Sequence, residues 1–167
     1  MEIKWVDTHC HLQLLNKNLD ENHFKNIEFL VIPGVDVESS SKAKEISSSL
    51  EVESYWSAGL HPHDAKLLDT QRHDLEKLFV EADLIGETGL DFYRNLSTKE
   101  EQRENFLFHL EFSKQLNKPI IIHCRDSFQD TYDLLVEFNN PSSAILHSWT
   151  GGRNCLLYTS PSPRDTE

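Results

Sequence analysis

The sequence has few cysteines, few basic residues relative to its acidic ones, and no long apolar run. Three cysteines are too few, and odd in number, for a disulfide framework, which fits a reducing compartment. No apolar run approaches the roughly 20 residues that span a bilayer, and the N-terminus lacks the pattern of a secretory signal. Lysine and arginine number 16 against 28 acidic residues, so a net charge of −12 excludes a protein that coats DNA regardless of sequence. We therefore expect a cytoplasmic protein without membrane contact.

The chain does contain a regular alternation of strand-like and helix-like segments. With 167 residues, 38% hydrophobic and 26% charged, its composition is that of one ordinary globular domain. Short β-rich runs predict strands at residues 3–8, 29–35, 55–60, 83–86, 119–123 and 144–147. Apolar spacing and capping residues predict helices at 39–50, 73–82, 97–117 and 127–138, with Ser97 capping the third. Repeated units of this kind build a parallel sheet.

The polar residues at the strand ends decide between two folds that have such a sheet. A doubly wound nucleotide-binding fold has a glycine-rich turn after its first strand, whereas this first strand leads into Asp7, Thr8, His9, Cys10 and His11. In a (β/α)8 barrel the catalytic groups lie at the carboxyl ends of several different strands. Polar groups end several of the predicted strands, so the fold class that we predict is α/β, a TIM-type (β/α)8 barrel.

Histidines at three strand ends and a glutamate at a fourth predict a metal site. His9 and His11 are two positions apart, so the period of a strand points both imidazoles to one side. Glu87, His123 and His147 end three later strands, so all five side chains would meet in one barrel mouth. This donor set suits zinc, manganese, nickel or cobalt better than magnesium or calcium. With Glu87 as a bridge, two ions would activate one water, so the constellation indicates hydrolysis.

Further polar residues at the same rim have two interpretations each. His61 and His63 either contact a substrate phosphate or cap a turn made rigid by proline, and His61 is favoured because it lies nearer the strand end. Arg125 offers a planar fork to a phosphate or forms an ion pair with Asp126. Asp91 accepts a hydrogen bond from a ligand imidazole or caps a helix.

The remaining histidines and the cysteines receive no catalytic role. His23, His73 and His109 lie in or near helical patterns. Cys10 and Cys124 lie beside ligand candidates, but their neighbours in the chain point to the opposite side of a strand. Packed structural thiols are therefore favoured over nucleophiles at these two positions.

Five segments of the sequence resemble the motifs of a known family. The segments that carry the resemblance are 7–12 (DTHCHL), 59–65 (GLHPHDA), 86–92 (GETGLDF), the helix start at Gln102 and Arg103, and 121–126 (IIHCRD). In order and spacing they are similar to the TatD family of metal-dependent hydrolases over residues 1 to about 152. The resemblance implies a TIM barrel with deoxyribonuclease activity in several members and D-aminoacyl-tRNA deacylase activity in some relatives. It also implies two divalent metal ions (zinc, manganese, magnesium, nickel or cobalt), bridged by Glu87 and held by His9, His11, Glu87, His123 and His147.

The C-terminal end departs from the family pattern. The resemblance implies an aspartate on the last strand that acts as metal ligand and general base, and nothing in this sequence supplies it. A (β/α)8 barrel normally needs about 200 residues or more, so we expect residues 1–153 to form a partial barrel, truncated after about six strands. Residues 154–167 resemble a translated sequencing adapter, the alternative being a genuine disordered tail rich in proline and serine.

The main functional hypothesis is a metal-dependent phosphodiesterase, a deoxyribonuclease that acts on single-stranded DNA or strand ends. In it Glu87 bridges the ions, and His61 and Arg125 hold the scissile phosphate. DNA is the expected partner, and no stable protein partner is expected. One alternative keeps the metal site but hydrolyses an ester or amide, such as a D-aminoacyl-tRNA link. Another alternative is an inactive fragment.

Overall fold

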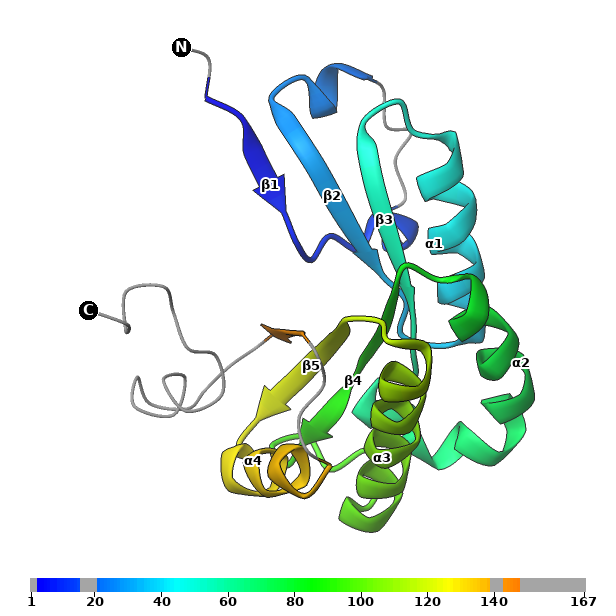
Figure 1. Ribbon diagram of the computed structural model, residues 1–167, viewed down its shortest axis with the longest axis vertical. Helices are drawn as coiled ribbons and strands as arrows, with labels where there is room; N and C mark the ends of the chain where they lie inside the picture. The colour runs from blue at the N-terminus through cyan, green and yellow to red at the C-terminus, as the bar shows by residue number, and fades with distance from the viewer. Residues whose placement is uncertain (1–2, 16–20, 139–142, 148–167) are drawn as a thin grey trace.

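A six-stranded parallel sheet, with its strands in chain order, is the centre of the molecule (Figure 1). The computed structural model describes residues 3–15, 21–138 and 143–147, so the predicted tail at 154–167 lies outside the described residues. The strands are β1 (Trp5–Asp7), β2 (Ile27–Pro33), β3 (Glu53–Ala58), β4 (Leu84–Asp91), β5 (Ile120–Arg125) and β6 (Ala144–His147). The helices are α1 (Val37–Ser49), α2 (Leu68–Glu81), α3 (Lys99–Leu116) and α4 (Phe128–Glu137), with 3-10 turns at Leu12–Leu14, Glu21–Phe24 and Pro62–Leu67.

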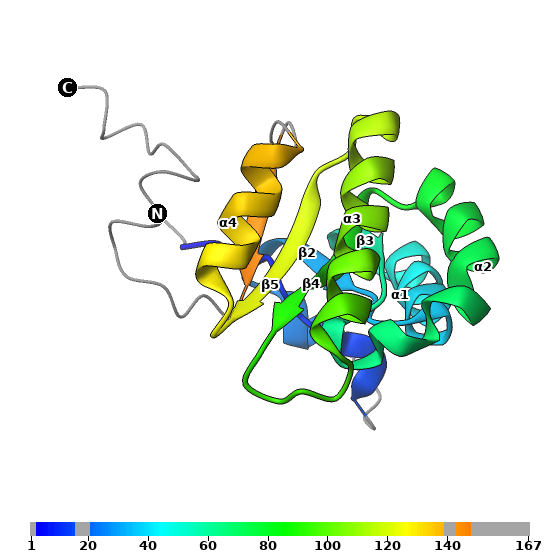
Figure 2. The same ribbon diagram turned by 90° about the horizontal axis from the view of Figure 1, so that it is seen from below.

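Every neighbouring pair of strands runs parallel, and the sheet curls with the helices on its outer side (Figures 1 and 2). Parallel pairing in chain order needs a crossover after each strand, and in a barrel these crossovers all lie on one face. The predicted fold class is confirmed, because six successive strands of a (β/α)8 barrel are present as a curled half-barrel. Among the described residues, no helix is long and apolar enough to cross a membrane.

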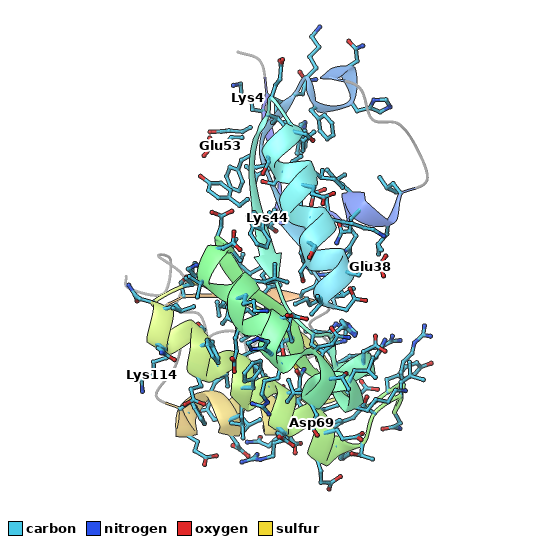
Figure 3. All side chains as sticks on the ribbon, turned by 90° about the vertical axis from the view of Figure 1, so that its right-hand side faces the viewer. Lys4, Glu38, Lys44, Glu53, Asp69 and Lys114 are labelled. Atoms are coloured by element: carbon cyan, nitrogen blue, oxygen red, sulfur yellow. The ribbon has the colours of Figure 1, made fainter. Side chains whose placement is uncertain are left out.

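The two faces of the sheet bury different side chains because alternate residues of a strand point to opposite sides. The face towards the helices carries the large core, in which Ile32, Ile85 and Ile122 pack against Phe79 of α2 and Phe106 of α3. Four of the charged side chains labelled in Figure 3 lie on the outer surface of the helices: Glu38 and Lys44 on α1, Asp69 on α2 and Lys114 on α3. Each helix therefore has the apolar inner stripe and polar outer side that its crossover position requires.

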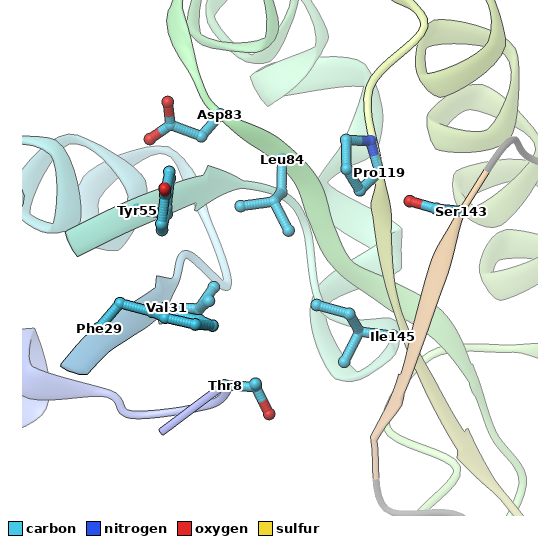
Figure 4. A pocket seen from close by; sticks show the side chains of 9 residues that line it. All are labelled: Thr8, Phe29, Val31, Tyr55, Asp83, Leu84, Pro119, Ser143 and Ile145. Atoms are coloured by element: carbon cyan, nitrogen blue, oxygen red, sulfur yellow. The ribbon is translucent and has the colours of Figure 1, made fainter. Parts of the chain in front are cut away.

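The inner face of the sheet is divided between an apolar hollow and a polar cluster. A smaller core of Val31, Leu84 and Ile121 lies on this face, beside Phe29 and Ile145. It borders an open hollow of about 460 Å³ to which β2, β3, β4 and β6 contribute side chains (Figure 4). Towards the carboxyl ends of the strands the same face carries histidines and carboxylates.

Three predicted boundaries are corrected. Strand β4 continues to Asp91, so Glu87 lies within the strand and does not end it. Helix α2 begins at Leu68 and not at residue 73, following directly on a 3-10 turn. The cap of α3 is Thr98 and not Ser97, because Thr98 exchanges hydrogen bonds with Glu101 in a capping box. The Ser97 hydroxyl donates instead to the His63 carbonyl oxygen (2.9 Å).

Gly89 allows β4 and β5 to approach closely beside the polar cluster. Its φ of +133° suits glycine, and a Cβ atom at this position would lie 2.1 Å from the carbonyl oxygen of His123. A side chain here would push the two strands apart. Glycine at position 89 thus keeps Glu87 and His123, which belong to neighbouring strands, within contact of each other.

Candidate metal centre

Imidazole nitrogens from the ends of four strands surround the buried carboxylate of Glu87, which is 2% exposed. The Oε2 atom of Glu87 faces Nε2 of His9 at 3.2 Å and Nε2 of His11 at 3.6 Å. The Oε1 atom faces Nδ1 of His123 (3.1 Å), Nε2 of His61 (3.8 Å) and Nε2 of His147 (3.9 Å). The structure therefore brings together all five predicted ligands and one of the two predicted phosphate contacts.

The surroundings of Glu87 keep it ionised. Burial alone raises the pKa of its carboxyl, but hydrogen bonds from three of the neighbouring imidazoles outweigh burial and hold the pKa well below its ordinary range. Burial lowers the pKa of His61 to about 3, and it also lowers the pKa of His147. An ionised carboxylate is the state that a metal ion requires of this ligand, and burial favours the neutral form of His61 and His147.

The hydrogen bonds of His11 leave its inner nitrogen free to bind a cation. Its Nδ1 atom lies 3.1 Å from the Pro33 carbonyl oxygen, which can only accept, so Nδ1 carries the proton of the neutral ring. Nε2, which faces Glu87 and lies 3.1 Å from Nε2 of His9, is then the nitrogen that can coordinate a metal ion. Two imidazole nitrogens and a carboxylate oxygen that converge in this way are the donor set of a divalent transition-metal ion.

The contacts of His123 fix its ring in the same manner. Its Nε2 atom lies 3.1 Å from Oδ2 of Asp91, and its Nδ1 atom faces Glu87. Hydrogen bonds from the Arg94 backbone and from two imidazoles outweigh burial and lower the pKa of Asp91 to about 2, so Asp91 is an acceptor. Asp91 therefore holds a proton on Nε2 of His123, and Nδ1, which faces Glu87, is the nitrogen that can coordinate a metal ion. A carboxylate behind an imidazole is a common device for orienting a metal ligand.

The residues fit two metal positions that share Glu87. Two groups have ligand atoms within 4.8 Å of one another: His9, Glu87 and His147 form one, and His61, Glu87 and His123 form the other. The rings of His9 and His147 are stacked, with centroids 3.5 Å apart. Nδ1 of His9 is buried without a hydrogen bond to the described residues, so one nitrogen of this ring has no polar partner among them. The donor chemistry of the first group thus fits a divalent metal ion, and Glu87 and His123 of the second group can contribute to another position.

His61 differs from the other imidazoles in its tautomer. Its Nδ1 atom accepts a hydrogen bond from the backbone N–H of His63 (3.2 Å), so the proton of the neutral ring lies on Nε2. That N–H points into an open pocket of about 310 Å³, which His11, His123 and His147 also line. A ring held this way donates a hydrogen bond, which suits contact with an anionic substrate better than it suits coordination of a metal.

Arg125 lies at the rim of the site and not against Glu87. It is two residues beyond His123 on β5, and its guanidinium carbon lies 4.0 Å from the ring centroid of Tyr93. Residue 125 pairs in register with Asp91 of β4. This placement puts a cation at the mouth of the site, beside the strand ends that carry the ligand candidates.

Buried polar side chains of α3 hold the strand ends in place. Asn105 donates to the Leu60 carbonyl oxygen (2.7 Å), and His109 accepts from the Leu60 N–H (3.0 Å), so both backbone groups next to His61 are fixed. One turn earlier, Gln102 accepts from the Asp91 N–H (2.8 Å) and donates to the Asp91 carbonyl oxygen (3.1 Å). All three side chains are fully buried. The helix therefore fixes the backbone on which two site residues stand.

Sequence reasoning left the roles of Asp91 and His63 open and gave His109 none, and the structure places all three in or behind the site. Asp91 contacts His123 and also His63, whose Nε2 lies 2.8 Å from Oδ2 of Asp91, while its other oxygen accepts from the backbone N–H of Tyr93 and Arg94. The predicted contact with a ligand imidazole is thus present, whereas the predicted helix cap is wrong, because Thr98 caps α3 and Asp91 binds the backbone of the turn after β4. His109 received no role, because a single histidine within a helical pattern carries no signal of what it contacts.

The cysteine beside the ligand candidates is a packed thiol. Cys10 donates from Sγ to the Val31 carbonyl oxygen (3.3 Å). Burial raises the pKa of its thiol to about 12, so it stays protonated at neutral pH. Cys124 is also buried, and both thiols are free. These surroundings agree with structural rather than nucleophilic roles.

Comparison with known proteins agrees with this geometry. The model of the family described as TatD related DNase matches residues 6–159. The chain belongs to this family. The resemblance that the motifs suggested is thereby confirmed, together with the barrel fold.

Two curated relatives and one solved structure show which individual proteins the chain is similar to. It is 32% identical to an uncharacterized metal-dependent hydrolase of Buchnera aphidicola, over 89% of this chain and 63% of the relative. It is 36% identical to the 3'-5' ssDNA/RNA exonuclease TatD of Escherichia coli K12, over 74% of this chain and 49% of the relative. The crystal structure of YJJV, a TatD homolog from Escherichia coli, superimposes with a TM-score of 0.82 at 20% identity, covering 93% of this chain and 64% of that one. The chain thus spans from 49% to 64% of the length of these relatives.

Proposed function

We propose that the protein is a metal-dependent phosphodiesterase that cleaves single-stranded DNA or the ends of DNA strands. The observation that carries the proposal is the arrangement of imidazole nitrogens around both oxygens of Glu87. The relative from Escherichia coli is named an exonuclease for single-stranded DNA and RNA, which supports a nucleic acid substrate.

In this proposal two divalent ions share Glu87 and are held by His9, His11, Glu87, His123 and His147. When bound, such ions activate water and neutralise charge on a phosphate group. The protein's own part is to aim one nitrogen of each ring at the metal position: Pro33 accepts from Nδ1 of His11, and Asp91 accepts from Nε2 of His123. These orienting contacts leave little rearrangement for metal binding to cause.

His61 and Arg125 hold the scissile phosphate. The Nε2–H of His61 faces the pocket between the ligand candidates and can donate to a phosphate oxygen. Arg125 at the rim can offer two parallel N–H groups to a neighbouring oxygen. The net charge of −12 opposes a long nucleic acid footprint, so binding relies on few phosphates placed close to the cations.

The test is a cleavage assay with the full-length protein, because the chain described here spans only part of its relatives' length. The protein is stripped with a chelator and reloaded separately with zinc, manganese, magnesium, nickel or cobalt. Single-stranded DNA labelled at either end is the substrate, and D-aminoacyl-tRNA is assayed in parallel. We expect DNA cleavage only after metal is added, and a loss of about 100-fold or more in Glu87→Gln.

The matched control is Glu111→Gln, which makes the same change at an exposed position of α3 and should leave the rate unchanged. Hydrolysis of D-aminoacyl-tRNA without DNA cleavage would assign the site to ester hydrolysis instead. Equal DNA cleavage by Glu87→Gln and the unaltered protein would show that the nuclease activity arises elsewhere.

A further inference from the structure

An exposed aromatic ring lies immediately beside the candidate metal centre. Tyr93 follows the end of β4 and is 61% exposed, although it is a large aromatic residue. It stands two residues after Asp91, which contacts His123. The guanidinium of Arg125 lies over its ring, at 4.0 Å from the centroid. Tyr93 lies two residues after Asp91, and Arg125 lies two residues after His123. The two pairs stand at the ends of the neighbouring strands β4 and β5.

The position of the Tyr93 ring is defined by its backbone. Its N–H donates to Oδ1 of Asp91 (3.0 Å), the side chain whose other oxygen contacts His123. The preceding N–H, of Phe92, donates to the Arg125 carbonyl oxygen (3.0 Å). The backbone that carries the ring is therefore fixed relative to the site, and the ring itself rests against the Arg125 guanidinium while staying open to solvent. A rigid exposed aromatic binds a partner at a low cost in conformational entropy.

The arrangement of Tyr93 and Arg125 suits a nucleotide. The guanidinium covers one face of the ring, so the large exposed area belongs to the rest of the ring. Aromatic side chains bind single strands by stacking on the bases, and every base has a face that can stack. An arginine that rests on an aromatic ring keeps its N–H groups for a phosphate oxygen. One base and its phosphate can therefore be recognised together, without the long basic groove that a net charge of −12 disfavours.

We propose that Tyr93 is the stacking platform for a nucleobase next to the scissile phosphate, with Arg125 supporting the ring and contacting the phosphate. This inference rests on the proposed function, because it names the part of the substrate that the rim of the same site recognises. It assigns single-stranded nucleic acid as the ligand, since in a duplex each base is already stacked within the helix.

The experiment compares two oligomers of equal length and charge on the full-length, metal-loaded protein. One is single-stranded DNA, and the other has the same backbone with every base removed. Both carry phosphorothioate links that resist cleavage, and Kd is measured by fluorescence anisotropy. We expect Tyr93→Ala to raise Kd for the DNA about 5- to 100-fold and to leave Kd for the abasic oligomer unchanged. Tyr93→Phe keeps the ring and should retain most of the affinity.

The control is Leu96→Ala, which removes another exposed apolar side chain (52% exposed) from the same loop and should change neither Kd. A base analogue whose fluorescence is quenched by stacking, 2-aminopurine, gives a second signal that should be lost in Tyr93→Ala only. If the unaltered protein binds both oligomers equally, or if Tyr93→Ala weakens both equally, the inference is wrong. If Tyr93 discriminates the two oligomers but no DNA is cleaved, the inference stands and the proposed function fails.

Discussion

The Nε2 atom of His123 lies 3.1 Å from Oδ2 of Asp91, while the other nitrogen of the same ring faces Glu87 at 3.1 Å. The ring therefore connects two carboxylates of β4 that stand four positions apart. Because Asp91 is ionised and can only accept, it determines which nitrogen of His123 keeps its proton. Asp91 thus controls the tautomer of a candidate ligand without itself facing the metal positions.

The first prediction concerns this contact. Asp91→Asn keeps the oxygen that accepts from the backbone of Tyr93 and Arg94 but removes the charge that faces His123. We expect metal affinity to fall about 10- to 100-fold with little change in folding. Competition with a chromophoric chelator measures the affinity. Asp69→Asn, at an exposed position of α2 labelled in Figure 3, is the control, and an unchanged affinity in Asp91→Asn would rule out the orienting role.

The second prediction concerns metal and stability. A ligand that binds only the folded state raises the free energy of unfolding, by about 2.7 kcal/mol at a concentration 100 times its Kd. We expect zinc or manganese to raise the Tm of the protein in a concentration-dependent manner, and a chelator to reverse the rise. Thermal unfolding with Glu87→Gln tests whether the shift comes from this site. An equal rise in that variant would place the bound metal elsewhere.

Much of the architecture could be predicted because strand and helix patterns are local. The six strands and four helices of the expected barrel units are present, and the histidines at strand ends converge as the barrel topology requires. The extent of β4 could not be predicted, since its last residues include Gly89, whose place in a strand depends on the close approach of β5. A local sequence pattern predicts a strand or a helix, but it does not show which other element packs beside it.

The same reason explains which site residues were left undecided. Asp91 lies before a helix, where a capping residue is expected, and only the folded chain shows that His63 and His123 reach its second oxygen. Arg125 was weighed as a partner of Asp126, whereas its stacking partner Tyr93 lies on another strand's loop. Both contacts join residues far apart in the sequence, and one sequence carries no record of them.

The third prediction tests the support that α3 gives to the strand ends. Gln102 makes three hydrogen bonds to backbone groups, two at Asp91 and one at Ser97, and it is fully buried. Gln102→Ala leaves those groups without a partner, so we expect a loss of about 2 kcal/mol in the free energy of unfolding. Urea denaturation measures it. Gln115→Ala on the exposed side of the same helix should cost less than about 0.5 kcal/mol, and equal costs would refute the argument.

The last prediction is a dependence of stability on pH that comes from His109. Complete burial lowers the pKa of this imidazole from 6.5 to about 4. The unfolded chain therefore binds a proton more readily than the folded one, so the contribution of His109 is complete above pH 6.5 and is lost as the pH falls towards 4. By linkage, this group alone reduces the free energy of unfolding by about 2 kcal/mol between pH 7.5 and pH 5.

His109→Gln isolates this contribution, because the glutamine oxygen can still accept from the Leu60 N–H and does not titrate. Urea denaturation of the variant and the unaltered protein is compared at pH 7.5 and pH 5. Other histidines with lowered pKa, such as His61 and His147, titrate in both proteins and cancel in the comparison. We expect the variant to lose about 2 kcal/mol less than the unaltered protein over this range. Parallel losses in the two proteins would mean that His109 is protonated in the folded state, and its hydrogen bond to Leu60 would then have to be absent.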